Sequence, residues 1–419
     1  MKLLLRVVAA LAACLGTPLA AQDYEPDCER IAAFLDDIVE QERVAGASAL
    51  VWKGGAERCF DAAGMADREK GREFNRDTVV QFFSMTKPVT GVAVMTLWEE
   101  GKFHLDDPLH WHLPEFRDVE VLRGETVDGR VITSPPRRPI TVRDVLRHTA
   151  GFTYGPDGDP QNHADLVWND LQPLSPDKSL AEFSQAMAQV PLLYEPGTQW
   201  HYSAAVDVQA RLVEVLSGKP FAQYVEKTIF DPLGMDDMGW PNARTDLHRL
   251  ATIYDVGPGG TFTPVLNPDW IAAGFVGKPM TMGGGGLVGT VDDYLRFARM
   301  LLGDGALDDV RILKPATVGL MATDHLDPSI GPERRSFLPG KGSGGFGFDF
   351  FVRTAPPATP DENRGSVGEF FWDGWPSMLF WVDPHQDMVV IFATQKMPFD
   401  NQLHHDFRDA VYGPEYTGR

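Results

Sequence analysis

Long apolar segments are scarce in this chain. After the N-terminal stretch, no run approaches the ~18 uncharged apolar residues that a membrane-spanning helix requires. We therefore expect the mature chain to be soluble. Internal repeats and low-complexity tracts are also lacking. With 419 residues, 43% of them hydrophobic, the chain is long enough to bury a large core, as one large domain or as two interleaved ones.

Cysteine is rare, with three residues in the chain. Cys14 lies in an N-terminal segment that carries Lys2 and Arg6, then a short apolar stretch, then small residues up to Ala21. This order is typical of a secretory signal. We predict that residues 1–21 are a signal peptide cleaved after Ala21, and that the protein is periplasmic or secreted. A second interpretation takes Leu11–Cys14 as a lipoprotein signal, with Cys14 as a lipid-carrying N-terminus.

Cleavage after Ala21 would leave two cysteines, Cys28 and Cys59. In an oxidising compartment, an even number of cysteines is compatible with a disulfide, here between an N-terminal helix and an early strand. Two buried free thiols are equally compatible with the sequence. Both alternatives stay open at this stage.

Basic residues are outnumbered. The chain has 38 Lys and Arg against 59 Asp and Glu, a formal net charge of −21. This balance argues against a nucleic-acid partner and against binding to an anionic membrane surface through charge. It favours solubility, and it leaves the oligomeric state undetermined.

Several familiar site motifs are missing or incomplete. No G-x-S-x-G elbow is present, which argues against an ordinary α/β-hydrolase. The run Gly342–Gly347 matches G-x-G-x-x-G, but it leads into a strand and not a helix, which argues against a dinucleotide site. His110–His112 and His404–His405 lack the context of a zinc site. We therefore expect no metal and no cofactor.

What is present is an S-x-x-K tetrad, Ser84 to Lys87. The β-prone run Val79–Phe83 precedes it, and an apolar stretch with helical spacing that ends at Gly101 follows it. A serine hydroxyl is a weak nucleophile that needs a base nearby, and residues three apart lie on one face of a helix. The spacing therefore predicts a nucleophile and its base.

The tetrad occurs twice, the second copy being Ser175 to Lys178. That copy lies in a polar segment with a proline, which predicts a loop or a helix cap. Ser84 could likewise be a helix N-cap, so the tetrad alone does not exclude a purely structural role for this serine. The strand-to-helix context favours Ser84 as the functional copy.

Tyr202 is a third candidate. It follows the Pro196–Gly197 turn and stands at the start of a predicted helix. Because a lysine ammonium favours phenolate, a tyrosine close to Lys87 could ionise below its usual pKa and relay protons. Most tyrosines at such junctions serve packing instead.

The elements predict a mixed α/β fold. A helix over 28–45 and strands over 47–52 and 58–64 open the chain, and strands over 346–352, 377–383 and 388–395 close it. Helical patterns fill the middle, and another follows Gly283–Gly286. We expect a central antiparallel sheet made from both chain ends and flanked by helices, with an inserted, mainly helical domain. The predicted division is 22–84 and 286–419 for the α/β domain and 85–285 for the helical one.

Six segments, in this order, resemble the serine β-lactamase and penicillin-recognising superfamily, and more narrowly the class C-like family VIII carboxylesterases. They are FFSMTKPVTG (82–91), LRHTAGF (146–152), YEPGTQWHYSAAVD (194–207), TMGGGGLVGTVDDYLRF (281–297), FGFDFFV (346–352) and GEFFWDGWPSMLFWVDP (368–384). The resemblance covers about Phe34 to Gln395. It implies a β-lactamase/transpeptidase-like fold, and it makes His148 a family marker that we interpret as structural.

The resemblance also implies a mechanism. Ser84 would attack a carbonyl and form an acyl-enzyme, with Lys87 and Tyr202 sharing the duties of base and acid. The oxyanion would be held by the backbone N–H groups of Ser84 and Trp375. By position, Trp372–Gly374 would be the substrate-binding third motif.

Departures from the family pattern narrow the substrate. Class C β-lactamases have Tyr-x-Asn where this chain has Tyr202–Ala204, and Lys-Thr-Gly where it has Trp372–Gly374. The amide, cation and hydroxyl that would meet a β-lactam are thus missing. Asp373 would repel anionic acyl groups. Phe370, Phe371, Trp372 and Trp375 would form an apolar wall, although aromatic residues on a sheet are more often core.

The leading hypothesis is therefore a serine esterase for small neutral carboxylic esters. Alternatives on the same scaffold are a β-lactam hydrolase, a D-amino-acid peptidase or amidase, and an acyltransferase. From a different class, a catalytically silent binding or cell-wall-sensing protein is conceivable. The intact set of Ser84, Lys87 and Tyr202 argues against the silent protein.

Overall fold

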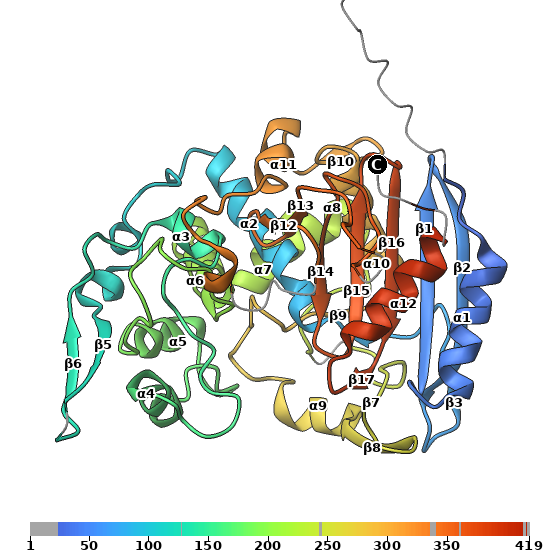
Figure 1. The fold of residues 1–419 in the computed structure, drawn as a ribbon, viewed down its shortest axis with the longest axis horizontal. Helices are drawn as coiled ribbons and strands as arrows, with labels where there is room; N and C mark the ends of the chain where they lie inside the picture. Colours follow the sequence, from blue (N-terminus) through green and yellow to red (C-terminus); the bar gives the residue numbers. More distant parts are fainter. Residues whose placement is uncertain are drawn as a thin grey trace, which may run out of the picture.

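The computed structural model describes residues 24–126, 128–242, 245–335, 341–359, 362–413 and 416. The predicted signal peptide 1–21 and Cys14 therefore lie outside the described residues. Figure 1 shows one large sheet, with the N-terminal strands (blue) beside the C-terminal ones (red) and most of the mid-chain helices to one side.

The sheet has eight strands in the order β12-β13-β14-β15-β16-β1-β2-β3, and its neighbours run antiparallel. Its strands are β1 (Gly46–Lys53), β2 (Ala56–Asp67), β3 (Arg72–Glu73), β12 (Gly344–Phe346), β13 (Phe351–Arg353), β14 (Phe370–Gly374), β15 (Met378–Asp383) and β16 (Met388–Thr394). The two chain ends join where β1 pairs with β16, from Ala47 opposite Thr394 to Lys53 opposite Met388. The predicted fold class is confirmed.

Helices cover both faces of this sheet, which is why β15 and β16 are buried along their whole length. Phe380 and Trp381 are neighbours in β15 and so point to opposite faces. Tyr294 of α10 contacts Phe380, with ring centroids 4.9 Å apart. Phe407 of α12 contacts Trp381 at 5.8 Å. The continuous apolar runs of these strands follow from burial on two sides.

The α-helices are α1 (Cys28–Glu40), α2 (Thr86–Glu99), α3 (Val142–Leu146), α4 (His163–Leu171), α5 (Leu180–Met187), α6 (Ala205–Ser217), α7 (Phe221–Val225), α8 (Asp231–Leu233), α9 (Pro268–Gly274), α10 (Val291–Leu302), α11 (Pro315–Met321) and α12 (Asn401–Tyr412). The remaining strands are β4 (Val80–Gln81), β5 (Val121–Glu125), β6 (Val131–Ser134), β7 (Ile253–Gly257), β8 (Thr261–Leu266), β9 (Val288–Gly289), β10 (Ala306–Leu307), β11 (Val310–Arg311) and β17 (Lys396–Met397). Helix α2 is mostly apolar and is buried from Thr86 to Leu97, which fits a central helix.

Two local predictions are wrong. The segment 346–352 is not one strand but part of the hairpin β12–β13, because the chain turns at residues 347–350, where Asp349 adopts a left-handed φ of 63°. Aspartate tolerates that conformation better than most residues. The hairpins β5–β6 and β7–β8 lie in a stretch expected to be helices and loops. The proposed division at residues 85 and 285 stays a prediction.

Cys28 in α1 and Cys59 in β2 form a disulfide, so the open question about these thiols is answered in favour of the bridge. The bridge ties the first helix to the sheet that it covers. Within the described residues, no helix combines the length and the apolar character needed to cross a membrane.

Reduction of this disulfide should lower the free energy of unfolding by about 4 kcal/mol, because the bridge closes a loop across a sequence separation of 31 residues and so restricts the unfolded chain. Urea unfolding with and without reductant measures the difference. A variant with serine at both positions, C28S/C59S, is the control and should not respond to reductant. Equal stability of the oxidised and reduced wild type would contradict the prediction.

Candidate active site

Ser84 lies in a 3₁₀ turn, Phe83–Met85, that leads directly into α2. The predicted strand before it is short: β4 pairs with β9, and Val79 forms an isolated bridge to Leu250. Phe83, the residue before Ser84, has a positive φ of 45°, a strained conformation for an aromatic residue. Tyr294 of α10 supports the turn, because its hydroxyl donates to the Met85 carbonyl at 2.8 Å.

The structure brings Ser84, Lys87 and Tyr202 together. Ser84 Oγ lies 3.0 Å from Lys87 Nζ and 2.6 Å from Tyr202 OH. Lys87 comes from the first turn of α2, while Tyr202 comes from the loop that precedes α6. Lys87 Nζ also lies 4.6 Å from the centre of the Tyr202 ring. One hydroxyl thus contacts both an amine and a phenol, the arrangement of an activated nucleophile.

Burial sets the protonation of these groups. Lys87 is 1% exposed, and desolvation lowers its pKa to about 8, although the carboxylates of Asp207, Asp349 and Asp373 oppose the shift. Burial raises the pKa of Tyr202, against the effect of its hydrogen bond to Ser84. The expectation that Tyr202 ionises below its usual pKa is therefore wrong, because its pKa is raised and not lowered. Lys87 is suited to accept the serine proton, and Tyr202 to donate one.

A glycine-rich loop, Gly283–Gly286, also contacts the Lys87 amine. Gly284 accepts a hydrogen bond from Lys87 Nζ on its carbonyl, at 2.6 Å, and its own N–H donates to Asp207 Oδ1 at 3.0 Å. A Cβ at position 284 would lie 2.7 Å from Asp207 Oδ2 and 2.8 Å from Tyr154 OH. Sequence reasoning missed Asp207 and Gly284 as site residues, although both lie in family-marker segments.

Strand β14 brings the third motif to the site. Trp372 is fully buried, and its Nε1 donates to Tyr202 OH at 3.4 Å, so it supports Tyr202 rather than lining an open wall. A Cβ on Gly374 would lie 2.6 Å from the Phe82 carbonyl, which explains why glycine stands where β14 meets the nucleophile turn. Trp375 follows with 47% of its surface exposed, and its ring lies 5.4 Å from that of Phe83. Phe370 and Phe371 are core residues.

Asp373 does not present a bare negative charge to the substrate. Its carboxylate forms an ion pair with the Lys341 ammonium, and the two residues are 3% and 4% exposed. The expected repulsion of anionic acyl groups by Asp373 is corrected accordingly, since the pair carries no net charge. Lys341 lies outside the motifs recognised in the sequence. Its pairing with Asp373 was not predictable because the two residues are 32 positions apart.

Two other features are separate from this cluster. Ser175 and Lys178 lie in a turn between α4 and α5, where the Lys178 N–H donates to the Ser175 carbonyl at 3.0 Å. Within the described ranges, no group of three or more His, Cys, Asp or Glu side chains is placed to hold a metal ion.

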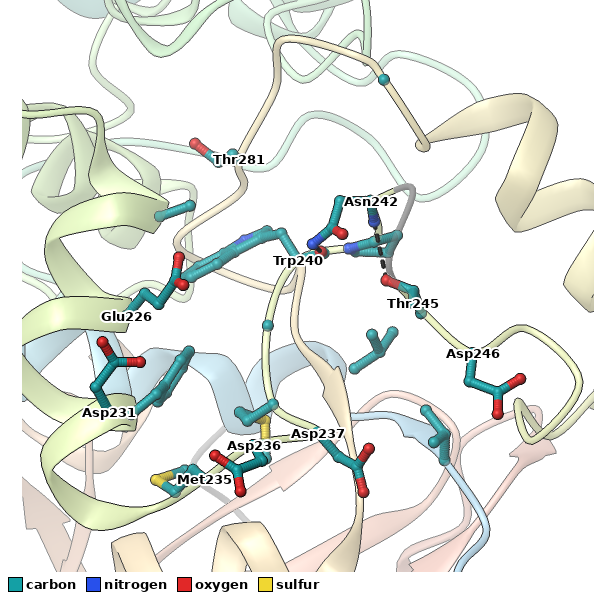
Figure 2. A pocket seen from close by; sticks show the side chains of 18 of the residues that line it. Glu226, Asp231, Met235, Asp236, Asp237, Trp240, Asn242, Thr245, Asp246 and Thr281 are labelled. Atoms are coloured by element: carbon teal, nitrogen blue, oxygen red, sulfur yellow. Dashed lines mark hydrogen bonds between the residues drawn. The ribbon is translucent and has the colours of Figure 1, made fainter.

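A cavity of about 520 Å³ lies beside Trp240 and Thr281 (Figure 2). Its lining is acidic, with Glu226, Asp231, Asp236, Asp237 and Asp246. Trp240 belongs to this lining and donates from Nε1 to the Met282 carbonyl at 2.9 Å. The lining residues do not include the Ser84 cluster, so this cavity is a neighbour of the site and not the space above the nucleophile.

The fold and the Ser84 cluster together define a serine enzyme that works through an acyl-enzyme. The beta-lactamase family profile matches residues 31–412, and the chain belongs to the beta-lactamase family. The protein is a serine hydrolase of that family.

Relatives and solved structures agree with this family. Esterase EstB of Burkholderia gladioli is 29% identical, over 91% of this chain and 94% of its own. The lovastatin esterase of Penicillium rubens is 30% identical, over 80% of this chain and 85% of its own. The structure of EstCE1, described as a hydrolase with promiscuous acyltransferase activity, superposes with a TM-score of 0.74 at 26% identity, covering 92% of this chain and 98% of that one.

The pKa of Lys87 predicts how the reaction depends on pH. If the neutral amine of Lys87 is the base, kcat/KM should rise roughly tenfold per pH unit below pH 8 and level off above it. Initial rates with a p-nitrophenyl ester between pH 5.5 and 9.5 measure the profile. Circular dichroism at each pH serves as the control for folding. A flat profile between pH 6 and 9 would contradict the assignment of Lys87 as the base.

Gly284→Ala should lower kcat by about ten- to a hundredfold, because the new Cβ collides with Asp207 and Tyr154 and displaces the carbonyl that holds Lys87. Steady-state kinetics with an ester measure the loss. Gly319→Ala is the matched control, since a Cβ there meets nothing within 4 Å. That variant should keep the wild-type rate. A wild-type kcat for Gly284→Ala would sink the prediction.

Proposed function

We propose that this protein is an exported serine esterase that hydrolyses small, neutral carboxylic esters. The observation that carries the proposal is the double contact of Ser84 Oγ, with Lys87 Nζ at 3.0 Å and Tyr202 OH at 2.6 Å. This geometry supplies a base for the nucleophile and an acid for the leaving group in one place.

In the first half of the reaction, Ser84 Oγ attacks the ester carbonyl while its proton moves to Lys87 Nζ. The oxyanion binds the backbone N–H groups of Ser84 and Trp375. When the C–O bond breaks, Tyr202 gives its proton to the departing alkoxide and regains one from Lys87. The alcohol leaves and the acyl group stays on Ser84, with the proton count unchanged.

In the second half, water attacks the acyl-enzyme in place of the alcohol. Lys87, neutral again, accepts a proton from the attacking water, and Ser84 Oγ leaves with a proton returned through Tyr202. The carboxylic acid departs, and the starting state is restored. An acceptor alcohol in place of water would give acyl transfer, so the two outcomes share every step but the identity of the second nucleophile.

Two features support an ester over a β-lactam. Ala204 is buried and stands where a β-lactamase would offer an amide to the substrate. The Lys341–Asp373 pair leaves no net positive charge from these two side chains for a substrate carboxylate. The esterases among the relatives, at 29% and 30% identity, point in the same direction.

Export is part of the proposal. It rests on the N-terminal pattern of residues 1–21 and on the Cys28–Cys59 bridge, which suits an oxidising compartment. Purification of the native protein from its source and sequencing of its N-terminus test this part. A mature chain that begins at residue 22 is expected, whereas a retained Met1 would overturn it.

A fluorophosphonate or p-nitrophenyl phosphonate should label Ser84, because it forms a stable adduct with an activated serine. Mass spectrometry of the digested protein locates the adduct. Ser84→Ala should lose the label and all but about a thousandth of the activity, while Ser175→Ala, the second tetrad, is the matched control and should retain both. Labelling that survives in Ser84→Ala would overturn the assignment of the nucleophile.

Turnover of a short-chain p-nitrophenyl ester, nitrocefin and a D-amino-acid anilide discriminates the substrate classes. We expect the ester to be hydrolysed with the highest kcat/KM. Lys87→Ala and Tyr202→Phe should each remove most of the ester turnover while the protein stays folded. A higher kcat/KM for nitrocefin or for the anilide would replace the esterase by a lactam or amide hydrolase.

A further inference from the structure

His148 lies behind the active site in a conformation that calls for an explanation. It follows α3, is 0% exposed, and has a left-handed φ of 56°. Histidine adopts this region less readily than glycine, so the surrounding structure must hold it there. The left-handed backbone directs the carbonyl and the ring of this one residue to the same neighbouring segment, the loop before α6.

That segment is the one that carries Tyr202, and His148 binds it on both sides of the tyrosine. The His148 carbonyl accepts the His201 N–H at 3.0 Å. Nδ1 of its ring accepts the Ser203 N–H at 3.2 Å. The ring also packs on the Tyr202 ring, with centroids 5.2 Å apart and planes inclined by 34°.

The ring is suited to this role in its neutral form. Burial lowers the pKa of His148 well below the usual value, so the imidazole is uncharged. Because Nδ1 accepts the Ser203 N–H, the proton belongs on Nε2. Nε2 lies 4.0 Å from Oδ1 of the buried Asp349 carboxyl group, and Gln209 in turn donates to that Oδ1 at 3.1 Å. The tautomer with its proton on Nε2 is thus the one that can accept the Ser203 N–H, and its protonated nitrogen is the one nearer to Asp349.

We propose that His148 is a positioning residue for the reaction, which clamps residues 201 and 203 and thereby keeps the Tyr202 hydroxyl on Ser84 Oγ. The inference rests on the proposed function, since it presumes that Tyr202 serves as the acid. It goes beyond a structural role because it assigns the hold on Ser203 to one side-chain atom, Nδ1. A displacement of about 1 Å at a reacting group can cost roughly a hundredfold in rate.

Two substitutions separate Nδ1 from the rest of the ring. His148→Asn retains an acceptor at the δ position and tolerates a positive φ, whereas His148→Gln moves its polar group to the ε position. The rate of Ser84 labelling by a p-nitrophenyl phosphonate is the readout. We expect His148→Asn to stay within about threefold of the wild type and His148→Gln to fall by about ten- to a hundredfold.

Introducing His148→Gln into the Tyr202→Phe variant distinguishes a positioning role from a general loss of structure. If His148 acts through the Tyr202 hydroxyl, His148→Gln should add less than about threefold in that background. His325→Gln, at a half-buried histidine stacked on Phe348, is the control and should leave the labelling rate unchanged. Thermal unfolding of each variant is recorded in parallel.

Three results would overturn the proposal: wild-type labelling in His148→Gln, the same factor of loss in both backgrounds, or a folded His148→Asn that loses as much as Tyr202→Phe. The result for His148→Asn tests the proposal even if the His148→Gln variant does not fold. If the wild type itself is not labelled at Ser84, the proposed function fails and this inference fails with it. Wild-type labelling with an unaffected His148→Gln overturns this inference alone.

Discussion

Activation of the Ser84 hydroxyl by the Lys87 amine requires the neutral form of that amine, and burial makes this form accessible by bringing the lysine pKa closer to physiological pH. Water would hold a lysine pKa above 10, whereas desolvation brings that of Lys87 to about 8. Three buried acidic residues nearby, Asp207, Asp349 and Asp373, oppose this lowering of the Lys87 pKa. Nucleophile activation thus depends on how tightly α2 and its surroundings exclude solvent.

The rest of the structure serves that exclusion and the geometry within it. Helix α2 is buried from Thr86 to Leu97, and Lys87 shares that burial in its first turn. Glycines stand where backbone must approach closely, Gly284 against Asp207 and Gly374 against the Phe82 carbonyl. Tyr202 rests between His148 and Trp372. Each contact joins segments that are distant in the chain.

Much of the fold was predictable because its signals are local. The amphipathic pattern of α1, the apolar runs of β15 and β16, and the S-x-x-K spacing of Ser84 and Lys87 each depend on neighbours within a few residues. The hairpin at Asp349 was missed because its turn depends on a left-handed φ inside an apolar run. The Lys341–Asp373 pair was missed because no periodicity links residues so far apart.

By itself, the sequence determined the family and the fold class and predicted the nucleophile and its base, because the spacing of residues along a helix and the order of motifs are properties of the chain alone. Only the tertiary structure decided that burial raises the pKa of Tyr202 and that Asp373 forms an ion pair with Lys341. It also decided that Cys28 and Cys59 form a disulfide, and that His148 accepts hydrogen bonds from the residues on either side of Tyr202. These outcomes depend on burial and on distances between separate segments. Desolvation and close approach arise only when the chain is folded.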